Sequence, residues 1–330
     1  MIDAMRTLIT GGAGFIGSHL AEALIARGDH VRVLDDASTG RADNLRALAG
    51  HARLEWVRGS ITDEHAVAAA VGGCDRIVHL AAAVGVRRIL ERQIDSISVN
   101  VIGTEMVLRH AATRATPVFL ASSSEVYGKG VSAPFREEDD TLIGATSRHR
   151  WSYACGKMLD EFLALAFWRE RGLPVRIGRF FNTTGPRQSA RHGMVLPRLC
   201  RAALGGGPLE VHGDGAQTRC FLHVADCVTA VIALMECDAA IGEVVNIGSR
   251  HEVAIRDLAR MVADQAGTGA AIRLVPYDEA FPVGGFEDLR RRVPDVAKLT
   301  RLTGWRESHD LAGIVRACLD DCRSRADAIG

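Results

Sequence analysis

A glycine-rich turn near the start of the chain constrains its fold more than any other feature. The stretch TGGAGFIG carries the pattern Gly-x-x-Gly-x-x-Gly at Gly11, Gly14 and Gly17, with Phe15 and Ile16 between the last two glycines. The first glycine of such a pattern permits a tight turn, the second lets the backbone approach a pyrophosphate, and the third lets a helix pack closely on a strand. Free N–H groups at the start of that helix favour phosphate binding. The turn therefore predicts a dinucleotide site.

Segments typical of strands and of helices alternate through the first half of the chain. Short apolar runs typical of strands occur at Arg6–Thr10, His30–Leu34, Leu54–Val57, Arg76–Leu80, Val118–Ala121 and Pro174–Arg179. Helices are expected over Phe15–Arg27, Ser96–Thr113 and Ser152–Glu170. Such alternation is typical of a parallel sheet with helices on both faces. Together with the glycine turn, it predicts an α/β Rossmann fold with a doubly wound parallel sheet.

The pattern becomes less regular after about residue 182. Glycine-rich turns cluster at 205–208 and 213–215, and helical periodicity returns over Ala225–Met235, Ile255–Ala266 and Leu311–Asp321. We therefore expect two parts, a dinucleotide-binding Rossmann domain at residues 1–182 and a smaller C-terminal α/β substrate-binding region at residues 183–330. The second part is expected to be interleaved with the core of the first.

An acidic residue at the end of the second predicted strand indicates which dinucleotide binds. Asp35 lies about 20 residues after the glycines, where a carboxylate accepts hydrogen bonds from a ribose 2′-hydroxyl. The same charge would repel a 2′-phosphate. The sequence therefore predicts NAD rather than NADP, although an Asp at this position could also simply begin a turn.

Charge and cysteine usage exclude several classes of function. The chain has 40 basic and 40 acidic side chains, so an even balance favours neither nucleic acid nor an anionic membrane as a partner. None of its eight cysteines forms a Cys-x-x-Cys pair, and zinc-site spacing is absent, so no metal is expected. The glycine turn lies too close to the first residue to leave room for a signal peptide, and no apolar run is long enough to cross a membrane. These observations favour a cytoplasmic protein.

Two residues on one predicted helix form a candidate catalytic pair. Tyr153 and Lys157 are four residues apart, which places both on one face of the helix. A neighbouring ammonium lowers the pKa of a phenol, so Tyr153 could accept a hydroxyl proton while a hydride leaves to NAD. Tyr-x-x-x-Lys is common by chance. Its position after a Rossmann motif and after a strand that ends in Ser122-Ser123-Ser124 favours the catalytic interpretation.

Several motifs along the chain resemble one known family. They are TGGAGFIG, HLAA at 79–82, Asn100 with Gly103-Thr104, ASSSEVYG at 121–128, YACGK at 153–157, RFFNTTGPR at 179–187, QTRCFLHVAD at 217–226 and NIGS at 246–249. The chain is similar to the extended short-chain dehydrogenases/reductases of the NAD-dependent epimerase/dehydratase family, which act on nucleotide sugars. The resemblance implies that the hydroxyl of Ser123 pairs with a substrate oxygen beside Tyr153. It also implies cofactor contacts at Ser60, Ile61, Leu80, Ala81, Ala82, Tyr153 and Lys157.

Ser124 and Glu125 favour one chemistry within that family. Simple 4-epimerases carry no acid at this position, and the 4,6-dehydratases of TDP-glucose carry Asp-Glu. The Ser-Glu pair resembles UDP-glucuronate decarboxylases. Oxidation of C4 in a sugar with a C6 carboxylate gives a β-keto acid, which loses carbon dioxide without a leaving hydroxyl to protonate. The resemblance thus implies conversion of UDP-glucuronate to UDP-xylose, to a UDP-4-keto-pentose, or to both.

Three alternatives remain open from the sequence. A UDP-hexose 4-epimerase and a nucleotide-sugar dehydratase would use the same tyrosine and lysine, whereas a non-catalytic NAD sensor would be expected to have lost one of them. For the nucleotide sugar, the resemblance implies contacts of Asn182 and Arg219 with the diphosphate, and of Arg292 with a phosphate or the uridine ribose. It also implies a homodimer built from two pairs of long helices.

Overall fold

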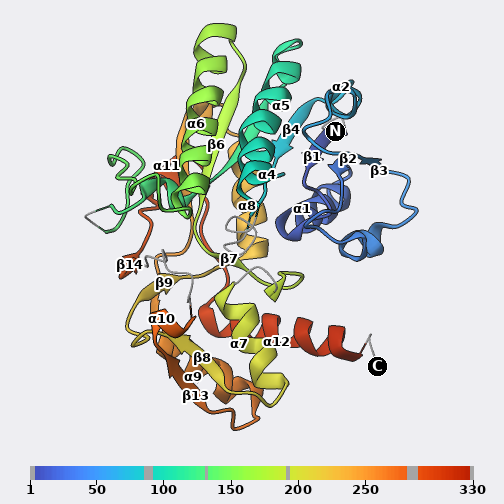
Figure 1. The fold of residues 1–330 in the computed structure, drawn as a ribbon. Helices are drawn as coiled ribbons and strands as arrows, with labels where there is room; N and C mark the ends of the chain where they lie inside the picture. The colour runs from blue at the N-terminus through green and yellow to red at the C-terminus, as the bar shows by residue number, and fades with distance from the viewer. Residues whose placement is uncertain (1–3, 85–91, 131–132, 191–193, 281–288, 328–330) are drawn as a thin grey trace.

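The computed structural model describes residues 4–84, 92–130, 133–190, 194–280 and 289–327. Figure 1 shows a layered core in the upper half of the molecule and a smaller C-terminal region below it. The core strands are β1 (Arg6–Thr10), β2 (His30–Asp35), β3 (Leu54–Arg58), β4 (Arg76–His79), β5 (Val118–Ser123), β6 (Val175–Phe180) and β11 (Val244–Ile247).

These seven strands form one parallel sheet. Their order is β11-β6-β5-β4-β1-β2-β3, and each adjacent pair runs parallel. The order 3-2-1-4-5-6 within it is that of a Rossmann fold, in which ligands bind at the carboxyl ends of the strands where the order reverses. The predicted α/β fold with a doubly wound parallel sheet is confirmed.

Helices cover both faces of the sheet, as two apolar cores require. One core joins the sheet to α1 (Phe15–Ala26), α8 (Val224–Met235) and α11 (Ala297–Thr303). The other joins it to α2 (Glu64–Val71), α5 (Gly103–Ala112) and α6 (Trp151–Arg171). Apolar side chains line one stripe of each helix, and burying one such side chain contributes about 1.5–3 kcal/mol. The two cores therefore hold the sheet edge, and any site on it, in a fixed position.

The helical stretch expected over Ser96–Thr113 is irregular. It consists of α4 (Gln93–Ile97), a π turn at Ser98–Ile102 and then α5. Asn100 is buried inside the π turn, and its Oδ1 accepts a hydrogen bond from the Ala83 amide at 2.7 Å. A π turn inserts one extra residue into a helix and is frequent at functional sites. Apolar periodicity does not reveal such an insertion, so a regular helix was the natural expectation.

The C-terminal region has its own apolar core. The region contains α7 (Val195–Leu204), α9 (Ile255–Ala266), α10 (Tyr277–Ala280), α12 (Leu311–Asp327), β8 (Leu209–His212) and β13 (Ile272–Val275). Short strands connect it to the Rossmann layers: β7 (Thr183–Thr184), β9 (Thr218–Cys220), β10 (Leu222–His223), β12 (Glu252–Ala254) and β14 (Arg291–Arg292). Short 3-10 helices are η1 (Ala42–Leu48), η3 (Ser124–Tyr127) and η5 (Asp238–Ala240).

The chain returns to the Rossmann layers after residue 182. Strand β11 extends the sheet beside β6, and α8 and α11 pack on the same face as α1. The second half of the chain therefore contributes to the Rossmann layers. We retain the boundary at residue 182 as a proposal about which residues bind NAD and which bind the nucleotide sugar. Within the described ranges, no helix has the length and apolar content that a membrane span requires. All eight cysteines are free thiols.

Candidate active site

The glycine turn connects β1 to α1 at the carboxyl edge of the sheet. Gly11 has φ of +73°, and a side chain there would press its Cβ to 2.8 Å from the Ala81 amide nitrogen. A Cβ on Gly14 would lie 2.9 Å from the Gly11 carbonyl oxygen, and one on Gly17 would collide with the same oxygen. The N-cap residue of α1 is Gly14, which has no side chain to cap the first N–H groups of the helix. The turn is thus compact, and its N–H groups fit a pyrophosphate.

Asp35 ends β2 beside this turn. One carboxylate oxygen accepts from the Ala13 amide at 2.9 Å, and the other accepts from the Ala37 amide at 2.7 Å. Burial raises the pKa of Asp35, whereas these two amide hydrogen bonds lower it. Each oxygen keeps a lone pair that can accept from a ribose hydroxyl. Asp35 therefore fits the NAD ribose and also braces the glycine turn, a second role that the sequence did not suggest.

The other predicted cofactor residues follow β3 and β4 at the same edge. Ser60 bonds to Thr62 at 2.9 Å between their hydroxyls, and Ile61 is buried against Gly103. Leu80 donates its amide to the Thr10 carbonyl at 3.1 Å, and Ala81 donates to the Thr10 hydroxyl at 3.2 Å. Ala82 follows directly. The structure thus brings these residues to the edge at which the glycine turn lies.

We expect Asp35→Asn to reduce the preference for NAD over NADP by about tenfold, because it removes one charge facing the 2′ position while retaining an acceptor oxygen. The measurement is the Kd of each dinucleotide by isothermal titration. Asp36→Asn is the matched control, because Asp36 is exposed and caps the Ser38 amide. Equal dinucleotide ratios in the wild type and in Asp35→Asn would contradict the prediction.

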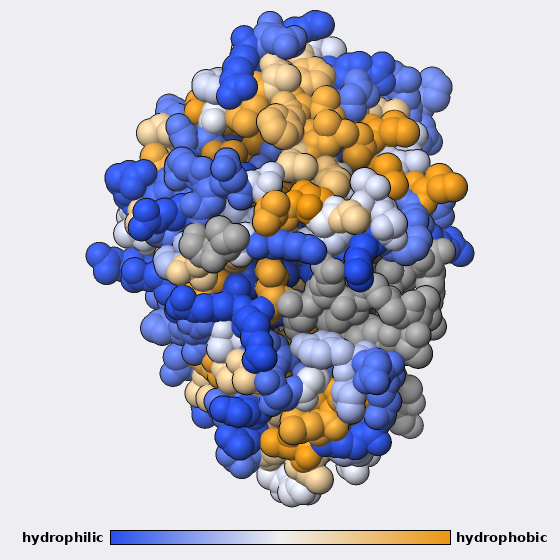
Figure 2. All heavy atoms as spheres, turned by 60° about the vertical axis from the view of Figure 1, so that its left-hand side comes forward, coloured by the Kyte–Doolittle hydropathy of each residue, from blue (hydrophilic) through white to orange (hydrophobic). Residues whose placement is uncertain are grey.

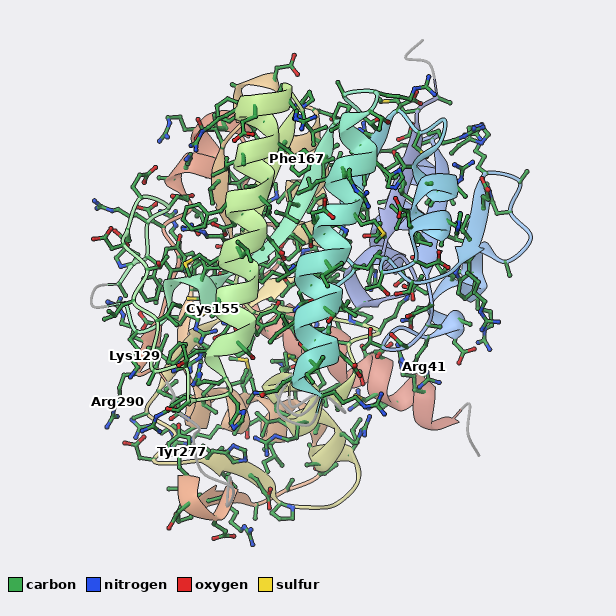
Figure 3. The ribbon with its side chains drawn as sticks, turned by 45° about the horizontal axis from the view of Figure 1, so that its top comes forward. Arg41, Lys129, Cys155, Phe167, Tyr277 and Arg290 are labelled. Atoms are coloured by element: carbon green, nitrogen blue, oxygen red, sulfur yellow. The ribbon has the colours of Figure 1, made fainter. Side chains whose placement is uncertain are left out.

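Tyr153 and Lys157 both project from the first half of α6. Cys155, two residues from each, lies in the half of α6 that faces the C-terminal region, where Tyr277 and Arg290 are labelled, and Phe167 lies toward the opposite end (Figure 3). Burial raises the pKa of Tyr153 and outweighs the lowering by Lys157 and by a hydrogen bond with Ser123. The ammonium acts in the expected direction, but the net pKa lies above its ordinary value.

Ser123 ends β5 and caps the turn η3 that follows. Its hydroxyl accepts from the Glu125 amide at 3.2 Å, and Ser123 lowers the pKa of Tyr153. Ser124 is buried at the start of η3. These contacts bring Ser123 and Glu125 close to Tyr153, whose pKa Glu125 raises.

Glu125 lies between two arginines. Arg292 donates from Nη1 to Oε1 at 2.6 Å, and Arg150 donates from Nη2 to Oε2 at 3.4 Å. Burial raises the pKa of Glu125, but the two guanidinium groups outweigh it and lower the pKa below its usual value. Glu125 is therefore a carboxylate at neutral pH. The site carries one negative and two positive charges here, a net positive charge.

The predicted substrate residues of the second half lie on neighbouring segments. Strands β9 and β14 pair in parallel, with Arg292 opposite Arg219. Arg219 donates to the carbonyls of Thr218 and Leu289 at 2.7 and 2.8 Å, and Asn182 donates to the Cys220 carbonyl at 2.9 Å. The ladder thus places two guanidinium-bearing residues side by side, which suits an anionic ligand.

A buried ion pair fixes α6 to the sheet behind the site. Glu161 accepts from Arg179 Nε and Nη2 at 2.9 and 2.7 Å, and the Ser122 hydroxyl also donates to it. Arg179 in turn stacks over the Tyr127 ring at 4.7 Å. Because Glu161 follows Lys157 by one turn, this network sets the position of the catalytic helix relative to β5 and β6.

Sequence reasoning missed two charged residues of the site, Arg150 and Asp160. Arg150 lies three residues before Tyr153, and Asp160 lies three residues after Lys157. Asp160 lies within the predicted helix and could have been found by extending the Tyr-Lys face one turn, whereas Arg150 is the N-cap residue just before α6 and carries no such signal. Among the described residues, no group of three or more His, Cys, Asp or Glu side chains could hold a metal ion.

The fold and the site together define a dinucleotide-dependent enzyme with a Tyr-Lys pair. Residues 8–318 match the family described as GDP-mannose 4,6 dehydratase. The chain therefore belongs to this family, which is of the extended short-chain dehydrogenase/reductase type that the motifs predicted.

Named relatives and solved structures agree with that assignment. The chain is 44% identical over 298 residues to the UDP-N-acetyl-alpha-D-glucosaminuronate decarboxylase of Bacillus cytotoxicus, covering 90% of this chain and 91% of that protein. It is 36% identical to UDP-glucuronic acid decarboxylase 6 of Arabidopsis thaliana, covering 91% and 84%.

Among solved structures, the UDP-glucuronic acid 4-epimerase of Bacillus cereus, in complex with UDP-glucuronic acid and NAD, superposes with a TM-score of 0.87 at 27% identity, covering 97% of this chain and all of that one. The NAD-bound dTDP-glucose 4,6-dehydratase of Streptomyces venezuelae also gives 0.87, at 31% identity and 98% coverage of both chains.

Proposed function

We propose that the protein is an NAD-dependent decarboxylase of a UDP-linked uronic acid. The expected substrate is UDP-glucuronate, and the products are UDP-xylose, a UDP-4-keto-pentose, or both. The observation that carries the proposal is the Glu125 cluster, in which two arginines and one carboxylate give a net positive charge beside Tyr153. Such a charge favours a sugar that carries a carboxylate over a neutral hexose.

The dinucleotide site supports NAD as the cofactor. NAD, when bound, accepts a hydride from C4 of the sugar and can return it. We propose that the chain holds it through Gly11, Gly14, Phe15, Ile16, Gly17, Asp35, Ser60, Ile61, Leu80, Ala81, Ala82, Tyr153 and Lys157. The compact glycine turn and the Asp35 carboxylate are the observations that support this set.

Tyr153 is proposed to take the proton of the C4 hydroxyl, with Ser123 hydrogen-bonded to the same oxygen. Ser123 lies close enough to Tyr153 to lower its pKa, so a C4 oxygen placed between them would meet both groups. Lys157 favours the phenolate by its charge. Oxidation leaves a ketone at C4, in the β position to the C6 carboxylate. The C5–C6 bond then breaks, its electrons move into the C4 carbonyl, and C5 later takes up a proton.

The carboxylate of the sugar is proposed to meet the Glu125 cluster. Arg292 Nε is a buried donor with no hydrogen-bond partner in the described part of the chain, so it can donate to an oxygen of the substrate. Glu125 would repel the sugar carboxylate, and this repulsion relaxes when carbon dioxide leaves. Ser124 borders this cluster. Asn182, Arg219 and Arg292 are proposed to contact the diphosphate side of the substrate.

The experiment is incubation with UDP-glucuronate and with its 2-acetamido analogue, followed by mass spectrometry of the products. Loss of one carbon dioxide supports the proposal, and the 44% identical relative is named for acting on the 2-acetamido uronate, which makes that compound the second substrate to test. UDP-glucose is the neutral control. Interconversion of UDP-glucose and UDP-galactose without carbon loss would instead identify a 4-epimerase, and loss of water would identify a dehydratase.

We also propose a homodimer formed through α4, the π turn and α6. Large apolar side chains are exposed on these segments: Ile94, Ile97, Ile102, Leu159 and Phe162, with Ile94 82% and Phe162 64% exposed. Figure 2 shows a band of hydrophobic residues on the upper part of the molecule, the part to which α5 and α6 belong in Figure 1. Such a patch on a water-exposed surface is typical of an interface, and two-fold pairing is the commonest symmetry.

Phe162→Asp should convert the dimer to a monomer at micromolar concentration, because it places a charge in an apolar contact. Light scattering coupled to size exclusion gives the mass directly. Leu274→Asp is the control, since Leu274 is comparably exposed at 55% but lies on β13 in the C-terminal region. A wild-type monomer, or an unchanged mass of the Phe162 variant, would contradict the proposal.

A cytoplasmic location is proposed as well. Eight free thiols, most of them buried, suit a reducing compartment. We propose that residues 1–182 bind NAD and that residues 183–330 bind the nucleotide sugar. The even charge balance supports neither nucleic acid nor a membrane surface as a partner.

A further inference from the structure

A buried carboxylate lies next to the catalytic lysine. Asp160 follows Lys157 by three residues on α6, and its Oδ2 accepts from Lys157 Nζ at 3.1 Å. The two side chains are 0% and 3% exposed. A lysine has a flexible stem of four carbons, and its ammonium must be held by partners to occupy one place. A charge pair this deeply buried is costly to desolvate, so it needs further support.

A line of hydrogen bonds from β1 ends at Thr104 on α5, a residue that lowers the pKa of Asp160. The Ala81 amide donates to the Thr10 hydroxyl at 3.2 Å, and Thr10 bonds to His79 Nδ1 at 2.7 Å. His79 Nε2 bonds to the Thr104 hydroxyl at 3.0 Å, and Thr104 lowers the pKa of Asp160. Asp160 Oδ1 is buried and has no hydrogen-bond partner within the described ranges, so it can accept a further hydrogen bond.

The protonation state of His79 determines which group donates in each of these hydrogen bonds. Burial, with a smaller contribution from Lys157, lowers the pKa of His79 to about 3, so its ring is neutral. A neutral ring has one donor and one acceptor. If Thr10, which already accepts from Ala81, donates to Nδ1, then Nε2 donates to Thr104. The Thr104 proton is then directed away from His79 and is available to Asp160.

We propose that Asp160 is a positioning residue that holds the Lys157 ammonium in place and sets the pH range in which the Tyr153–Lys157 pair works. The proposal rests on the proposed function, because it assigns Tyr153 and Lys157 their roles in C4 oxidation. Asp160 acts through Lys157 and is not itself expected to touch the substrate.

The charges around the pair determine the direction of the effect. Burial lowers the pKa of Lys157, but Asp160, Tyr153 and Glu161 raise it above its ordinary value. Asp160 also raises the pKa of Tyr153, as does Glu125 from η3. Two neighbours of the pair add no net charge: His79 on β4 is neutral, and Thr104 on α5 is an uncharged hydroxyl. The charge of Glu161 is balanced by Arg179 on β6.

The test is the pH profile of NADH formation for Asp160→Asn. Asparagine keeps the shape of the side chain and removes its charge, so the pKa values of Tyr153 and Lys157 should both fall. The rise of activity at low pH, which reports Tyr153, and its fall at high pH, which reports Lys157, should both move to lower pH by about one unit. The ratio of kcat at pH 6 to kcat at pH 9 should therefore rise. A purely structural role would lower kcat at every pH and leave both limbs in place.

Glu170→Gln is the matched control, because it removes one negative charge from the exposed C-terminal end of the same helix. Its profile should match that of the wild type. Asp160→Ser, which is also neutral, replaces Asp160→Asn if the latter fails to fold, as judged by circular dichroism. Wild-type turnover with an unshifted Asp160→Asn or Asp160→Ser profile overturns the role of Asp160 alone. Absence of wild-type turnover with every UDP-uronate overturns the proposed function itself.

Discussion

Tyr153→Phe should lower turnover of the UDP-uronate by about a thousandfold, the scale of a lost acid–base group. Phenylalanine keeps the ring that packs at the start of α6 but has no phenol to accept the C4 proton. Since oxidation at C4 precedes loss of carbon dioxide, NADH formation and carbon dioxide release should fall together. Stopped-flow absorbance and trapped carbon dioxide measure the two steps.

Tyr127→Phe is the control for this variant. Tyr127 is a buried tyrosine whose hydroxyl donates to Asn246 Oδ1 at 2.7 Å, in the core behind the site. Its loss should lower the free energy of unfolding by about 1 kcal/mol and leave turnover nearly unchanged. Carbon dioxide release by Tyr153→Phe at a rate near that of the wild type would show that another group accepts the proton.

Glu125→Gln should lower kcat for carbon dioxide release about a hundredfold and lower KM as well. Glutamine fills the same space between Arg150 and Arg292, but the cluster then gains one unit of positive charge. The uronate carboxylate should bind more tightly, and the repulsion that relaxes as carbon dioxide leaves is lost. Steady-state kinetics give the two constants, and NAD binding by titration should be unchanged.

Glu138→Gln is the surface control, because Glu138 is 74% exposed and pairs only at 3.5 Å with Lys298. Its kinetic constants should equal those of the wild type. Because the two arginines outweigh burial and lower the pKa of Glu125, the wild type should show no loss of activity from Glu125 protonation near neutral pH. An unaltered kcat in Glu125→Gln would remove this carboxylate from the decarboxylation step and favour the 4-epimerase alternative.

Features with short sequence separation were predicted from the sequence alone. The glycine turn follows from local backbone geometry, since the left-handed φ at Gly11 favours glycine. The joint placement of Tyr153 and Lys157 follows from helical periodicity, and the parallel sheet follows from the alternation of strands and helices. These are consequences of a few neighbouring residues, so one sequence is enough to predict them.

Tertiary structure decided which distant residues meet. Glu125 and Arg292 are 167 residues apart and come together because β14 pairs with β9 beside the core. The seventh sheet strand, β11, comes from the second half of the chain, and the π turn at Asn100 interrupts a helix whose apolar pattern looks regular. The line from Thr10 through His79 to Thr104 joins two strands to α5, and Asp160 pairs with Lys157 on α6. Local preferences determine periodicity and turns, whereas such contacts depend on how whole layers pack, which no short stretch of sequence encodes.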